Sequence, residues 1–209
     1  MRSLLWIMLT AWSSLGQTAT TELTFDVFLD DEPIGFHRVS IQEMPGERRV
    51  QVEAEMEVDF LFFTAFSYRH RADELWREDC IFELETRTDD DGQRLSVDAG
   101  PLGDALEVVT PSERKRLDGC VRTFAYWDRD FLDASELLNS QTGELVPVEV
   151  EALEPRRIPY LGSDIEAQPY RLTGEGLQLE VFYAGDRWVG LESTVEGGRI
   201  LRYEMVQEA

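Results

Sequence analysis

Apolar and acidic residues alternate along residues 50–59, and this alternation constrains the fold more than any other feature of the sequence. Successive side chains of a β-strand point to opposite faces, so such a strand has one dry face and one anionic, water-facing side. The even-numbered residues are apolar and the odd-numbered ones polar or acidic: Val50, Gln51, Val52, Glu53, Ala54, Glu55, Met56, Glu57, Val58 and Asp59. Alternation recurs in other segments, so we expect a sheet with an apolar inner face and an acidic outer face.

The strand-like segments predict a meander of antiparallel strands joined by short turns, such as Asp30–Pro33, Pro45–Glu47 and Asp89–Gly92. One segment, Tyr126–Asn139, has apolar residues at helical spacing and predicts a single helix. A sheet of many strands cannot stay flat. We therefore predict an all-β, mainly antiparallel fold, in which a strongly curved meander sheet or open barrel of about ten strands is capped or plugged by one helix. A two-sheet sandwich is the alternative.

Residues 1–16 have the pattern of an export signal peptide. Arg2 supplies the positive start, Leu4–Trp12 the apolar centre, and Ser14 and Gly16 the small residues near a cleavage site. A membrane anchor is the alternative, but the apolar stretch is shorter than the ~20 residues that span a bilayer. We expect residues 17–209 to form a single antiparallel β domain that is periplasmic and not transmembrane after cleavage.

Acidic residues outnumber basic ones by 42 to 20, which gives a formal net charge of −22 at pH 7. Proteins that bind nucleic acids use Lys and Arg to replace the counterions of the phosphates. We therefore expect no nucleic-acid partner. The composition leaves the oligomeric state open.

The two cysteines, Cys80 and Cys120, are expected to form a disulfide, because an exported chain matures in an oxidising compartment. A reactive pair is the alternative, but the chain has no Cys-x-x-Cys spacing. Closing a loop of about 40 residues is expected to stabilise the fold by about 4 kcal/mol.

Both histidines fall on the apolar side of the alternation. His37 lies on the inner side of its strand, and His70 shares its side with Tyr68, Glu74 and Trp76. These side chains are expected to meet in one apolar interior, where polar groups need partners. They either satisfy one another as part of the core or orient the polar end of a ligand.

No catalytic, metal-binding or cofactor-binding signature accompanies the histidines. The sequence has no Gly-x-Ser-x-Gly motif and no Gly-rich phosphate loop before a helix. A zinc site needs at least three ligands, and only two histidines exist beside the two paired cysteines. We therefore predict no catalytic residues, no metal and no cofactor, and favour a non-enzymatic protein.

The alternation fails over residues 60–66, where four phenylalanines occur within seven residues. One interpretation is a bend that is covered on both faces. The other is an apolar lip at the mouth of a cavity, in contact with lipid or an acyl ligand. We interpret Trp127 and Trp188 as core aromatics. The candidate ligand-binding residues are His37, Tyr68, His70, Glu74, Trp76, Phe62 and Phe63.

Several segments together resemble a family of exported proteobacterial proteins of unknown function. The resemblance rests on Phe28–His37, Phe60–Phe62 followed by Tyr68–His70, Glu74–Trp76, Leu137–Leu145 and Arg187–Leu191. More distantly, the layout is similar to periplasmic lipoprotein-carrier proteins, which hold acyl chains in an open barrel covered by helices. This second resemblance implies a hydrophobic small molecule or lipid as partner.

The leading hypothesis is a periplasmic binding module that holds a hydrophobic or amphipathic ligand, a lipid or acyl chain, inside a curved β-sheet. One alternative is a structural or assembly factor of the cell envelope that has a filled core and no ligand. A second alternative is a hydrolase or metal-dependent enzyme that uses His37 and His70.

Overall fold

The computed structural model describes residues 19–60 and 63–209, and within these ranges the chain forms sixteen strands and two short 3-10 turns. The strands follow one another as β1 (Thr20–Leu29), β2 (Glu32–Met44), β3 (Glu47–Phe60), β4 (Phe63–Arg77), β5 (Cys80–Asp90), β6 (Gln93–Leu102), β7 (Ala105–Val109), β8 (Arg114–Asp118), β9 (Glu136–Leu138), β10 (Leu145–Pro147), β11 (Glu149–Ala152), β12 (Arg156–Tyr160), β13 (Ser163–Gly174), β14 (Leu177–Ala184), β15 (Arg187–Thr194) and β16 (Ile200–Glu208). The 3-10 turns are η1 (Arg129–Asp133) and η2 (Glu196–Gly198).

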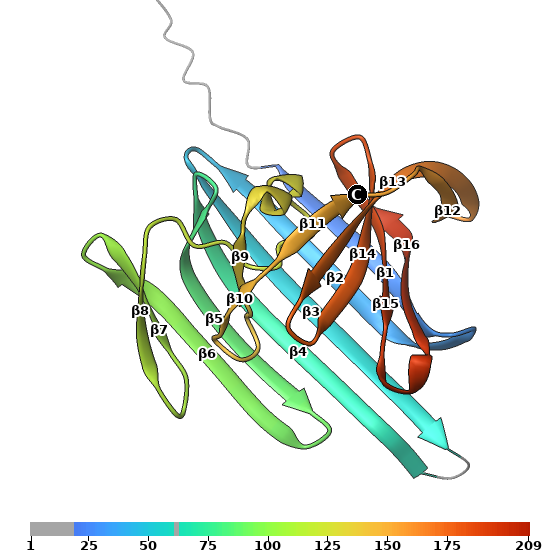
Figure 1. The fold of residues 1–209 in the computed structure, drawn as a ribbon, viewed down its shortest axis with the longest axis horizontal. Helices are drawn as coiled ribbons and strands as arrows, with labels where there is room; N and C mark the ends of the chain where they lie inside the picture. The colour runs from blue at the N-terminus through green and yellow to red at the C-terminus, as the bar shows by residue number, and fades with distance from the viewer. Residues whose placement is uncertain (1–18, 61–62) are drawn as a thin grey trace, which may run out of the picture.

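Fourteen strands belong to one large sheet in the order β11-β13-β14-β15-β16-β1-β2-β3-β4-β5-β6-β7-β8, with β12 beside β13 and β16. The first strand pairs with both the last and the second, so β1 lies near the middle of the sheet. Neighbours on the path are antiparallel, and the one parallel contact in this sheet joins β12 to β16. In Figure 1 the orange and red strands β14 and β15 lie in front of the blue and cyan β2–β4.

The all-β class and the curved, barrel-like sheet confirm the sequence-based expectation, but the predicted count of about ten strands is too low. The strands that sequence reasoning missed include β8, β12 and β13. β8 is a highly charged edge strand, and charge is a common feature of edges that must not pair further. β13 contains Pro169, which sequence patterns treat as a breaker of strands.

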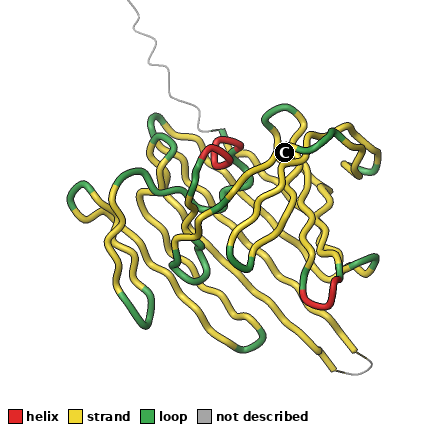
Figure 2. The backbone as a smooth tube through the Cα atoms, in the orientation of Figure 1, coloured by secondary structure: helices red, strands yellow, loops and turns green. Residues whose placement is uncertain are grey.

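The helix predicted over 126–139 is wrong. The Asp128 side chain caps only the short turn η1, the backbone is already extended at Ala134, and the chain then enters β9. Figure 2 accordingly shows helical colour only at two small turns. Phe131, Leu137 and Leu138 are buried as predicted, although not on a helix. A short apolar run of this kind does not distinguish a helix from a buried extended segment.

The alternation along β3 confirms the predicted division into an inner and an outer face. Val50, Ala54 and Met56 are buried, whereas the intervening glutamates belong to the opposite face. The core lies inside the curve of the sheet, where Phe25, Trp76 and other inner-face residues pack with residues of the later strands. In the described part of the chain, no helix is long and apolar enough to cross a lipid bilayer.

Residues 121–146, which we call the covering segment, lie against the inner face of the sheet. Val121, Phe131 and Leu138 belong to the same buried cluster as the inner-face residues of β1–β3. The Trp127 ring meets the Trp76 ring edge-on, with 5.4 Å between ring centroids. The covering segment therefore occupies the place where a capping helix was expected, and it does so largely with extended backbone.

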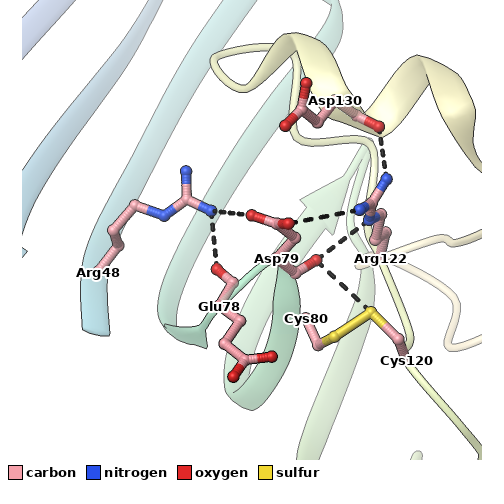
Figure 3. Close-up of a disulfide and its surroundings, with 7 residues drawn as sticks. All are labelled: Arg48, Glu78, Asp79, Cys80, Cys120, Arg122 and Asp130. Atoms are coloured by element: carbon pink, nitrogen blue, oxygen red, sulfur yellow. Dashed lines mark hydrogen bonds and ion pairs between the residues drawn. A yellow bond between two sulfur atoms is a disulfide. The ribbon is translucent and has the colours of Figure 1, made fainter. Parts of the chain in front are cut away.

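The predicted disulfide is confirmed, since Cys80 at the start of β5 is bonded to Cys120 just before the covering segment. Figure 3 shows that Arg48 and Arg122 converge on the Glu78–Asp79 turn beside this bond. The Arg122 side chain also reaches the Asp130 carbonyl oxygen at 2.5 Å. The disulfide and the hydrogen bond from Arg122 Nε to the Asp79 carbonyl oxygen, at 3.1 Å, attach one end of the covering segment to the sheet.

Candidate ligand-binding site

The register of the sheet places both histidines in one row across the inner face. His37 of β2 pairs with Ala54 of β3, and Ala54 pairs with His70 of β4. Strands lie 4.7–4.9 Å apart, so the two histidine backbones are separated by about 10 Å. Only the methyl group of Ala54 stands between the two imidazoles along this row, which leaves space above it.

This space is part of a cavity of about 290 Å³, which we call the inner chamber. It lies between the inner face of β2–β4, the strands β15 and β16, and the covering segment. Polar and aromatic side chains dominate its lining, which includes His37, Tyr68, His70, Glu74, Thr123, Tyr126, Trp127, Asn139, Ser140, Gln141, Glu175, Trp188 and Tyr203. Four of the predicted ligand-binding residues therefore share one chamber: His37, Tyr68, His70 and Glu74.

His37 is surrounded by aromatic rings. Its ring centroid lies 5.7 Å from Trp188, 5.3 Å from Tyr203 and 6.4 Å from Phe25. Burial, and secondarily the nearby His70, lower the pKa of His37 to about 3. Its ring is therefore neutral at ordinary pH. Its Nδ1 atom is buried and has no hydrogen-bond partner among the described residues. A buried ring nitrogen without a partner lowers the stability of the folded state.

His70 is held by its neighbours on either side. Its Nδ1 atom lies 2.8 Å from the hydroxyl of Thr88, which is the residue opposite it on β5. The Tyr68 ring stacks on the His70 ring, with 6.3 Å between the two ring centroids. Burial lowers the pKa of His70 to about 4, so this imidazole is also neutral. Because Thr88 occupies Nδ1, Nε2 is the ring nitrogen with which His70 can meet a ligand.

Glu74 brings a carboxyl group into the lining. Burial raises its pKa to about 7, although the hydrogen bond from Trp76 opposes the shift. The Trp76 indole Nε1–H donates to Oε2 of Glu74 at 2.7 Å. Trp76 itself does not line the chamber and instead packs on Trp127. Trp76 is therefore not a lining residue as predicted, and its role is to hold Glu74 in position.

A second cavity of about 540 Å³, the outer chamber, adjoins the inner one. Tyr68, Gln141 and Tyr203 line both chambers and form the boundary between them. The rest of the outer chamber is mostly aliphatic or aromatic: Leu29, Ile34, Met56, Val58, Phe66, Asp90, Val195, Arg199 and Leu201. The outer chamber reaches the protein surface, because Phe66 and Arg199 in its lining are exposed.

The hydroxyls at the boundary between the chambers stay protonated. Burial, and then the neighbouring Tyr203 and Asp90, raise the pKa of Tyr68 above its ordinary value, while Gln141 opposes the shift. Burial likewise raises the pKa of Tyr203 and of Tyr126. The boundary therefore presents neutral groups that can donate or accept hydrogen bonds.

Two predicted residues have no described side chain, because Phe62 lies outside the described residues and so does the side chain of Phe63. Phe66 from the same aromatic segment does line the outer chamber. Sequence reasoning missed Tyr126, Gln141 and Tyr203, and it assigned Trp127 and Trp188 only to the core.

One signal could have found Tyr203, because it shares its side of β16 with Leu201 and Met205. No local signal places Gln141, which comes from the covering segment. Among the described residues, no group of three or more His, Cys, Asp or Glu side chains is arranged to hold a metal ion.

Comparison with known proteins identifies a family and a solved structure with a similar fold. A family model described as domain of unknown function (DUF6134) matches residues 25–206. No curated protein matches the sequence. A crystal structure titled as a β-barrel-like protein of the domain of unknown function DUF1849 from Brucella abortus is similar to this chain, with a TM-score of 0.66 and 10% identity, over 91% of this chain and 97% of that one. At this identity the similarity concerns the fold alone, and it confirms the barrel-like layout expected from the sequence.

Proposed function

This chain belongs to the family described as domain of unknown function (DUF6134), and we propose that it is a binding module for a hydrophobic or amphipathic ligand, a lipid or acyl chain. One observation carries the proposal. An inner chamber that holds the polar side chains described above and a mostly aliphatic outer chamber adjoin inside the curved sheet and share three lining residues. This division matches a molecule with a polar end and an apolar chain.

The dimensions and chemistry of the chambers support the proposal. Ligand pockets are typically about 300–1,000 Å³, mostly apolar, with a few polar groups that fix orientation. The outer chamber supplies the apolar part through Leu29, Met56 and Leu201. The inner chamber supplies the orienting groups, of which His37 and His70 come from one row across the same sheet face rather than from loops. Such placement holds them in defined positions.

The proposal includes a periplasmic location after export. The disulfide between Cys80 and Cys120 supports it, because such bonds form and persist in oxidising compartments. The leader assigned to residues 1–16 lies outside the described residues. Its removal is checked by determining the N-terminus of the secreted protein.

Binding fits the chambers better than the two alternative functions. An assembly factor without a ligand needs no interior space, whereas these cavities reach about 290 and 540 Å³. Catalysis by the two histidines needs their reactive nitrogens on one substrate group. The imidazoles arise from positions about 10 Å apart, and the hydroxyl beside His70 belongs to the buried Thr88.

Native mass spectrometry of the exported protein, purified without detergent, tests the proposal directly. We expect a co-purified molecule and saturable binding of a fluorescent fatty alcohol. The variant Ala54→Leu fills the space between the imidazoles and is expected to weaken binding by about tenfold or more. Ala105→Leu adds the same atoms at a buried position outside both chambers and controls for general overpacking. If neither assay finds a ligand, or if both variants bind like the wild type, the proposal fails.

A further inference from the structure

We infer that the polar end of the ligand is an uncharged group that both donates and accepts hydrogen bonds, such as a hydroxyl or an amide, and is not a carboxylate or a phosphate. This inference rests on the proposed function and specifies the class of ligand for the same site. It follows from which charged side chains the inner chamber contains and which it lacks.

Among the described residues, no Lys or Arg lines the inner chamber, and the two ionisable acids in the lining are Glu74 and Glu175. An anionic head group that enters this chamber loses its water and gains no opposite charge. An unpaired charge removed from water costs several kcal/mol. The carboxyl groups and the net charge of −22 make the field around an incoming anion still less favourable.

Two arginines that could be considered as partners of an anion already pair with carboxylates. Arg199 lines the outer chamber, but its Nε atom donates to Asp30 at 2.8 Å, and the lining of the same chamber includes Asp90. Arg48 shares the inner side of β3, yet it is bound to Asp128 at 2.6 Å and does not line either chamber. An anionic head would have to replace one of these carboxylates.

The groups that do line the inner chamber suit a neutral polar head. A neutral imidazole offers one donor and one acceptor, and both histidines are held in that form by burial. Asn139, Gln141 and the hydroxyl of Tyr68 add further donors and acceptors. A hydroxyl or amide in the ligand can also satisfy His37 Nδ1, which lacks a partner among the described residues.

Three amphiphiles with the same chain length test the inference at pH 8: monopalmitoylglycerol, palmitate and hexadecyltrimethylammonium. Competition against a bound fluorescent fatty alcohol measures their affinities. We expect monopalmitoylglycerol to bind about tenfold or more tighter than palmitate.

The half-buried Gln141 at the boundary of the chambers offers a gain-of-function variant, Gln141→Lys, which supplies the missing cation. This variant is expected to bind palmitate more tightly than the wild type, while Gln178→Lys on the exposed side of β14 changes nothing.

The outcomes separate the inference from the proposed function. Palmitate or the ammonium amphiphile binding as tightly as monopalmitoylglycerol to the wild type overturns the inference and leaves the binding module intact. An unchanged affinity of Gln141→Lys for palmitate also counts against it, provided that the variant retains the melting temperature of the control. If none of the three displaces the probe and no probe binds, the proposed function itself fails.

Discussion

The inner and outer faces of β2–β5 are made by alternate residues of the same strands, yet they differ in how they hold charge. On the outer face, arginines and glutamates pair across strands, as Arg71 does with Glu53 at 2.8 Å and Arg69 with Glu57 at 2.6 Å. On the inner face, burial keeps His37 and His70 neutral. The outer charges remain in contact with water and with opposite charges, whereas each polar group on the inner face needs a hydrogen-bond partner inside the protein.

The largest expected effect comes from placing a charge on the inner face. Val97 and Ser96 are adjacent in β6 and point to opposite faces, and Val97 is fully buried. We expect Val97→Asp to lower the free energy of unfolding by about 3–5 kcal/mol, because the carboxylate has no partner. Ser96→Asp lies opposite Arg87 and is expected to change stability by less than about 0.5 kcal/mol. Urea denaturation of both variants measures the difference; similar losses would contradict the division into two faces.

The disulfide holds the covering segment over the inner face, and its removal is the next largest effect. The bond joins residues 40 positions apart. We expect the Cys80→Ala/Cys120→Ala double variant to lose about 2–4 kcal/mol of stability. Hydrogen exchange should show the loss concentrated in the covering segment, while strands β3 and β4 inside the large sheet keep their protection. An equal loss of protection throughout the protein would contradict the view that the disulfide mainly stabilises the covering segment.

Glu74 makes stability depend on pH in a direction opposite to the histidines. Its pKa is raised from 4.5 to about 7 by burial, so the folded state binds its proton more tightly than the unfolded state. This contribution is complete below pH 4.5 and is lost as the pH rises through 7, a change of about 3 kcal/mol. Glu74→Gln should abolish this loss. Chemical denaturation from pH 4.5 to 8 measures it, and an unchanged slope in the variant would refute the assignment.

The lowered pKa values of His37 and His70 act in the opposite sense. Their contribution to stability is present above pH 6.5 and is lost as the pH falls towards 4 and then 3. We expect His70→Gln to reduce the loss of stability between pH 6 and 4. Thermal melts over this range, compared with those of wild-type protein, provide the measurement; the same acid loss in both proteins would remove His70 as its source.

The smallest effect is expected on the outer face. The side chains of Arg71 and Glu53 are both substantially exposed. A double-mutant cycle with Arg71→Ala and Glu53→Ala should give a coupling of about 0.5 kcal/mol or less, which added salt reduces further. A coupling of several kcal/mol would mean that the outer face contributes structure of its own, and the contrast between the faces would need revision.

The orientation of the site residues was predictable from the sequence because it depends on local parity. His37, Tyr68, His70 and Glu74 follow the alternation of their own strands, and all four line the inner chamber. The pairing of Cys80 with Cys120 was equally predictable, since the described chain offers no other cysteines. A side chain in a strand can face only one of two sides, and two cysteines allow only one intramolecular disulfide, so few alternatives had to be excluded.

The remainder of the chamber depends on contacts that local patterns do not encode. Tyr203 faces His37 only because β16 pairs with β1 across most of the length of the chain. Gln141 reaches the boundary of the chambers because the covering segment is extended. The predicted helix failed for a related reason: Leu137 and Leu138 are adjacent and both fully buried, which the tertiary packing of a segment covered on two sides permits.

The small side chain of Ala54 leaves part of the inner chamber empty. A larger aliphatic residue at that position would add buried apolar surface, and selection for thermostability alone would tend to favour it. The same change would fill the part of the inner chamber that the proposed ligand needs. If the proposed function holds, relatives without a ligand should be recognisable by a bulky residue at this position together with a higher melting temperature.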